Sequence, residues 1–126
     1  MMNKFIIIFV SAVMLNSPCI AIQGDFPVIR WECLGLSYNQ QAQMKELDSK
    51  WQKINQNLRT NIINDQKALQ YILSNPYSTH NEIIELHNRI LSNKTTLRAQ
   101  AMEIFLEKRD VLTQGQKKNL HLIISR

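Results

Sequence analysis

The segment SNPYSTHNE, residues 74–82, lies in the middle of a long run of sequence that contains no glycine. The run extends from Gly35 to Gly115, and Pro76 is the single proline within it. Glycine and proline are the residues that most strongly interrupt helices, so their absence on both sides of Pro76 favours helical structure there. The residue before a proline is displaced from the helical region of backbone space, so the first helix should end near Asn75. The run therefore predicts two long helices joined by one reversal.

We expect helices near residues 37–74 and 79–111, antiparallel, with the reversal at Asn75–Ser78. At a rise of 1.5 Å per residue, each arm would be about 50 Å long. A hairpin of that length has no compact centre in which to build an enzyme pocket. The fold class is therefore predicted to be all-α, and the role to be binding, sensing or chaperoning rather than catalysis.

Each predicted helix begins with a capping box, in which a serine or threonine side chain and a glutamine or glutamate three residues later satisfy each other's backbone amides. The three pairs are Ser37 with Gln40, Thr79 with Glu82, and Thr113 with Gln116. The third pair opens a short last helix, expected over residues 114–124.

Apolar residues in the second helix recur every seven positions, which is typical of a helix that supercoils against a partner. This seam consists of Ile83, Ile90, Leu97, Ile104 and Val111. A neighbouring row, interrupted by Arg98, consists of Ile84, Leu91, Phe105 and Leu112. The matching stripe of the first helix includes Met44, Leu47, Trp51, Ile54 and Leu58. One hairpin cannot cover both rows of the second helix, so we expect a homodimer.

The first 21 residues have the order of a secretory signal: the basic Lys4, an apolar block over residues 5–15, and small residues before Ile22. We expect cleavage after Ala21, which places the protein in the periplasm. An uncleaved membrane anchor and lipidation of Cys19 are the alternatives.

The rest of the chain is predicted to form a lead segment over residues 22–35 and a helical domain over residues 36–126. A short helix over residues 28–34 is expected in the lead segment. Cleavage after Ala21 would leave Cys33 as the single cysteine, which excludes a bridge within the chain. Cys33 is then a packing residue, an intermolecular bridge or a thiol ligand.

The formal net charge of +5 is spread over the chain without a long basic run, so we expect no nucleic-acid partner. The histidines, His80, His87 and His121, are too far apart in sequence for two of them to share one face of a single helical turn. We interpret them as solvated residues, with a dimer-bridging metal site at His80 or His87 as the alternative.

The segments Leu36-Ser37-x-x-Gln40 and Leu112-Thr113-x-x-Gln116 are two copies of one pattern. This pattern resembles the LTxxQ signature of the periplasmic Spy/CpxP chaperone and stress-adaptor proteins. The turn at residues 74–82 and the segment at residues 108–113 are similar to those of the periplasmic heavy-metal sensor and resistance group, the CnrX-like and ZraP-like proteins.

The resemblance implies a hooked, dimeric, periplasmic hairpin, and in the sensor branch a metal site. Carried over one by one, the ligand positions of that site fall on Pro27, Trp31, Asp48, Ile104 and Lys108. Only Asp48 among them could bind a metal ion. We therefore expect no cofactor, with a divalent transition metal at Asp48 as the alternative.

The function that follows is a non-catalytic sensor or adaptor of the heavy-metal-resistance type, acting on an inner-membrane regulator. The alternative is a Spy/CpxP-like chaperone that holds unfolded client proteins. The chain would touch a membrane only if its N-terminal segment is uncleaved.

Overall fold

The computed structural model describes residues 19–23 and 26–125 of the 126-residue chain. The protein is all-α in class, because helices make up most of the described residues and the strands form one small hairpin. The elements in chain order are β1 (Ile20–Gln23), β2 (Phe26–Ile29), the 3-10 helix η1 (Trp31–Leu34), α2 (Tyr38–Ser74), α3 (His80–Val111) and α4 (Gln114–Ile124). They fall into two units: a helical hairpin over residues 38–111, and an end unit that joins the described residues up to Ser37 with those from Leu112 onward.

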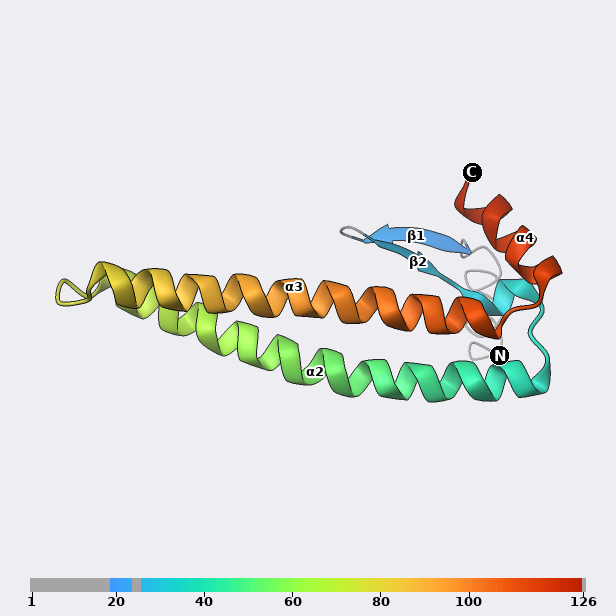
Figure 1. Cartoon of the computed structure of the whole chain (residues 1–126), viewed down its shortest axis with the longest axis horizontal. Coiled ribbons are helices and arrows are strands. Elements are labelled where there is room, and N and C mark those ends of the chain that lie inside the picture. Colours follow the sequence, from blue (N-terminus) through green and yellow to red (C-terminus); the bar gives the residue numbers. More distant parts are fainter. Residues whose placement is uncertain (1–18, 24–25, 126) are drawn as a thin grey trace, which may run out of the picture. The chain divides into compact units, whose positions relative to one another are not determined.

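The hairpin unit consists of α2, with 37 residues, and α3, with 32. At the standard rise the two helices are about 55 and 48 Å long. They run antiparallel and side by side from the turn to their other ends (Figure 1). The predicted helices and their reversal are confirmed to within one residue at each end.

The turn at residues 75–78 is held by its own polar groups. The amide of Ser78 donates to the carbonyl of Asn75 at 3.2 Å, which closes a four-residue turn around Pro76. The Asn75 side chain accepts from the amide of Tyr77 at 3.0 Å. Thr79 and Glu82 then exchange the two bonds of a capping box, at 3.2 and 3.3 Å, and α3 begins.

The seam of α3 faces α2 of the same chain. Ile90 and Ile104 are buried, together with Leu86, and opposite them α2 buries Met44 and Ile62. The seam residues Ile83, Leu97 and Val111 are half-buried.

The neighbouring row of α3 is exposed at two of its four positions and covered, wholly or in part, at the other two. Ile84 and Leu91 are exposed, as the periodicity predicts. Phe105 is half-buried. Leu112 is buried, because the chain has left α3 there and the residue belongs to the core of the end unit.

The end unit contains the antiparallel pair β1 and β2, in which Ile20 lies opposite Ile29 and Gln23 opposite Phe26. The expected helix over residues 28–34 is therefore wrong in its first part, since Val28 and Ile29 lie in β2 and only Trp31–Leu34 is helical. The chain leaves η1 through Gly35, whose φ of 65° is the left-handed conformation that favours glycine.

A small apolar core holds the end unit together. Ile29 of β2 and Leu34 of η1 are buried, and so are Leu112 and Leu120, the latter on α4. α4 contacts η1. The predicted last helix, residues 114–124, matches α4 at both ends. The structure thus groups this helix with the N-terminal segment rather than with the hairpin.

Among residues 19–23 and 26–125, no helix is both long enough and apolar enough to cross a membrane. The expected leader over residues 1–21 lies mostly outside the described residues, which include only its last three positions.

Adjacent residues of α3 allow a matched test of the seam. Ile90 is 4% exposed and Leu91 is 48% exposed. Ile90→Ala should lower the free energy of unfolding by about 2–5 kcal/mol, because it leaves a cavity between the helices. Leu91→Ala should change it by less than about 0.5 kcal/mol when both variants are measured at protein concentrations low enough to keep the chain monomeric. Urea unfolding followed by circular dichroism measures both, and equal losses would show that α3 is rotated from the orientation described.

Candidate functional site

Asp48, the acid that the resemblance implies as a metal ligand, lies on α2 and forms an ion pair with a residue of α3. The Nζ atom of Lys108, on α3, donates to Oδ1 of Asp48. The Lys108 side chain is only 13% exposed, whereas that of Asp48 is 62% exposed. The lysine stem therefore lies against the hairpin, and its ammonium reaches outward to the carboxylate.

Three of the five carried-over positions lie on the hairpin, and two of these, Asp48 and Lys108, are paired. Ile104, one turn before Lys108, is buried in the seam between the helices. Trp31 and Pro27 lie on η1 and β2, in the end unit. On the hairpin, then, a fixed ammonium group lies beside the acid that the resemblance implies as a metal ligand.

Two further ion pairs cross from α2 to α3. Lys50 Nζ lies 3.1 Å from Glu107 Oε1. Arg89 donates to both carboxylate oxygens of Asp65, at 3.0 and 2.8 Å. The hydrogen bond from Arg89 lowers the pKa of Asp65. Burial opposes this effect in part, and the positive charge of Arg89 adds a smaller lowering. These pairs fix the register of the two helices more than they stabilise them, because exposed ion pairs contribute at most about 1 kcal/mol each.

No three histidine, cysteine, aspartate or glutamate side chains converge on a metal-sized space in the part of the chain that the structure describes. His80 and His87 are exposed on α3, and His121 is exposed on α4. A shallow, open hollow on α4 is lined by Lys117, Lys118, His121 and Leu122.

Each of the two LTxxQ copies ends in a glutamine, Gln40 in the first and Gln116 in the second. Each glutamine side chain donates to a backbone carbonyl of the residue that precedes the other copy. Gln40 Nε2 donates to the carbonyl of Val111 at 3.0 Å, which joins the start of α2 to the end of α3 within the hairpin unit. Gln116 Nε2 donates to the carbonyl of Gly35 at 3.1 Å and to that of Leu34 at 3.4 Å, within the end unit. Val111 immediately precedes the second copy and Gly35 immediately precedes the first.

Gln116 also keeps its capping role. Its Oε1 atom accepts from the amide of Thr113 at 2.9 Å, and its own amide donates to the Thr113 hydroxyl at 3.2 Å. One amide side chain therefore begins α4 with its oxygen and ties α4 to η1 with its nitrogen. Sequence reasoning identified the cap, and the repeated pattern gave no sign of the second bond.

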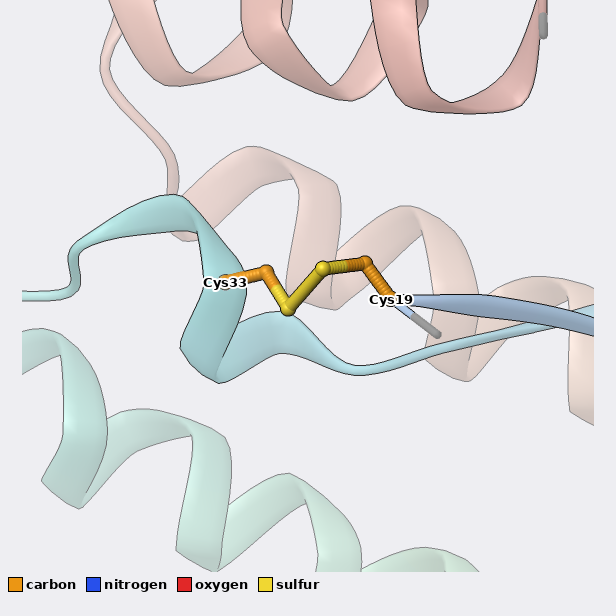
Figure 2. Close-up of a disulfide and its surroundings, with 2 residues drawn as sticks. All are labelled: Cys19 and Cys33. Carbon is orange, nitrogen blue, oxygen red and sulfur yellow. A yellow bond between two sulfur atoms is a disulfide. The ribbon is translucent and has the colours of Figure 1, made fainter. Parts of the chain in front are cut away.

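Cys33 forms a disulfide with Cys19, which corrects the expectation that no bridge within the chain exists. The two Cα atoms are 6.1 Å apart and the residues are separated by 14 positions. Figure 2 shows that the bridge links the start of β1 to η1. A bridge that closes a loop of this size stabilises a fold by roughly 3 kcal/mol. The prediction failed because Cys19 was assigned to a removed leader; a second cysteine 14 residues upstream was the available signal.

The exposed side of α3 carries four large apolar residues, which we call the outer row: Ile84, Leu91, Met102 and Leu106. Each is between 44% and 55% exposed. The steps from Ile84 to Leu91 and on to Met102 are about two and three helical turns, so these side chains lie on one face of the helix. Scattered exposed apolar residues are normal in proteins, but a row along one face is a surface that can bind another protein.

Comparisons of the chain with models of known protein families, with curated proteins and with solved structures find no match.

The second bond of Gln116 can be tested without removing the cap. Gln116→Glu keeps an oxygen that can accept from Thr113 but removes the donor, and it places a carboxylate against the carbonyls of Leu34 and Gly35. Amide hydrogen exchange in α4 should become faster by about fivefold or more, which corresponds to a loss of about 1 kcal/mol. Gln114→Glu adds the same charge in the same turn and should have little effect. Unchanged α4 exchange in Gln116→Glu would contradict the role of these bonds.

The lowered pKa of Asp65 predicts a pH-dependent contribution to stability. A carboxylate whose pKa is lower in the folded state stabilises the fold above its ordinary value of 3.8, and the contribution disappears as the pH falls through the folded-state pKa. Asp65→Asn should therefore lower the melting temperature at pH 7, with the difference from the unsubstituted chain closing below pH 3.8. The exposed Asp110→Asn serves as the control. A difference that persists undiminished at the lowest pH would show that the ion pair is not its cause.

Proposed function

We propose that the protein is a non-catalytic sensor or adaptor of the bacterial envelope, which works as a homodimer paired along its helical hairpin. The observation that carries this proposal is the outer row of α3. Its four side chains are apolar and lie on one face of α3, and they remain exposed after α2 has covered the seam. Covering such a surface removes apolar area from water, which is favourable in free energy.

The location in the periplasm is supported by cysteine chemistry and by the N-terminal sequence. Both cysteines of the chain are joined in one bridge. Disulfides persist in oxidising compartments such as the periplasm and are rare in the cytosol. The basic start and apolar block over residues 1–15 supply the corresponding export signal.

We propose that the family-type metal site is degenerate in this chain. Asp48 is the one carried-over position with a metal-binding side chain, and its carboxylate accepts from the ammonium of Lys108. Binding a cation there would mean displacing Lys108 and using a single carboxylate in its place. Zinc, nickel and cobalt instead prefer several converging nitrogen or sulfur donors.

A homodimer is the form in which we expect the adaptor to work. The two rows of α3 point in different directions, and one copy of α2 covers only the seam. A second copy that packs on the outer row would bury Ile84 and Leu91, which lie about two turns apart.

A Spy/CpxP-like chaperone is the second candidate, favoured by the tip of the hairpin. Tyr71 and Leu73 at the end of α2 are exposed, and Tyr77 in the turn is 90% exposed. Large amphipathic side chains at the end of a long arm could contact unfolded clients without a fixed geometry.

The outer row is tested by adding one charge to it. Leu91→Lys should convert the dimer to a monomer in sedimentation at about 100 μM protein, because the ammonium would be buried without a partner. Ser92→Lys adds the same charge at the next, exposed position and should remain dimeric. A monomeric unsubstituted chain at that concentration would contradict the dimer. Suppression of client aggregation that survives Leu91→Lys but is lost on replacing Tyr71 and Tyr77 with serine would favour the chaperone.

The metal prediction is tested by isothermal titration. The purified chain should show no saturable site for zinc, copper, nickel or cobalt ions tighter than about 1 μM. Asp48→Ala is the matched variant, and its titration should be indistinguishable from that of the unsubstituted chain. One saturable site that is abolished by Asp48→Ala, or by replacing His80 or His87, would restore a metal-sensing role.

A further inference from the structure

The residues just after the apolar leader block are part of the fold of the end unit. The Cys19 side chain is bridged to Cys33, and its carbonyl accepts from the amide of Arg30 at 2.7 Å. Ile20–Gln23 then pairs with Phe26–Ile29 along the whole of β2. One covalent bond and a strand ladder thus hold residues 19–23 to the rest of the unit.

This arrangement conflicts with two of the three fates of the N-terminal segment. Cleavage after Ala21 would remove Cys19 and half of β1, and it would leave β2 with an open edge and Cys33 with a lone thiol. Lipidation of Cys19 would place its sulfur in a thioether, and that sulfur could not also bond to Cys33. Only a chain that keeps Cys19 with an unmodified sulfur can form the bridge.

We infer that the exported chain retains Cys19 and oxidises it with Cys33, so that any processing of the leader occurs on the N-terminal side of Cys19. This inference rests on the proposed export. An uncut leader meets the same condition, because it too keeps the sulfur of Cys19 available.

The oxidation is a thiol–disulfide exchange. One cysteine thiolate attacks the disulfide of an exported thiol oxidase and forms a mixed disulfide, with release of one oxidase thiol. The other cysteine thiolate then attacks the mixed disulfide at the sulfur of the first cysteine, which forms the Cys19–Cys33 bond and releases the second oxidase thiol. The chain loses two electrons and two protons in all, and the oxidase disulfide gains them. The exposed position of Cys33 makes it accessible to such a protein.

The test uses the full chain with a C-terminal tag, expressed in a Gram-negative host and recovered from the envelope fraction. Free thiols are alkylated before and after reduction, and the product is read by intact mass and N-terminal sequencing. We expect a chain that contains Cys19, carries no alkyl group before reduction and carries two after it.

Three variants show which cysteine and which processing position account for the result. Cys33→Ser should leave Cys19 as a free thiol that takes one alkyl group without reduction, and Cys19→Ser should do the same for Cys33. Ala21→Val replaces the small residue that cleavage after position 21 would need, with a residue suited to a strand. Because the proposed processing does not use Ala21, this variant should yield the same N-terminus as the unsubstituted chain.

Two results would overturn the inference in distinguishable ways. An envelope chain that begins at Ile22, with precursor accumulating in Ala21→Val, would contradict the retention of Cys19 while leaving the proposed export intact. A chain found only in the cytosol, full length and with both thiols alkylated before reduction, would contradict the export and the inference together.

Discussion

The contact between the seam of α3 and the stripe of α2 is the interaction on which the rest of the hairpin depends. Ile90 and Ile104 are buried against a helix from the same chain, and this fixes the rotation of α3 about its axis. Once the rotation is fixed, every other face of α3 is determined. The outer row must then face away from α2, and Lys108 must lie near Asp48. The exposed apolar surface and the ion pair are thus two consequences of one packing choice.

The hairpin could be predicted from sequence because its signals are local. A helix-breaking proline, capping pairs and a seven-residue repeat each act within a few residues and agree with one another. The fold of the end unit could not be predicted in the same way. β2 has a strand partner only if β1 is kept, and the bridge exists only if Cys19 is kept. Because the leader was predicted to end at Ala21, neither β1 nor the Cys19–Cys33 disulfide could be predicted.

The candidate site was predicted in part. The periodicity identified Ile84 and Leu91 as residues that one hairpin leaves uncovered, and both are exposed. Met102 and Leu106 were not recognised as members of the same face, since they follow the interruption at Arg98 and do not continue the seven-residue spacing. The pairing of Lys108 with Asp48 joins positions 60 residues apart. A contact of that kind depends on the register of two helices, which no local pattern reveals.

The crossed bonds of Gln40 and Gln116 have a consequence for how this sequence can change over evolutionary time. Each glutamine donates to backbone carbonyls, at Val111 and at Leu34 and Gly35. Every residue carries a carbonyl, so these bonds place no demand on the side chains that receive them. Gly35 is restricted for a separate reason, its positive φ. Selection that preserves these hydrogen bonds should therefore act almost wholly on the two donors, Gln40 and Gln116. Substitutions at Leu34 and Val111 should be limited by packing alone.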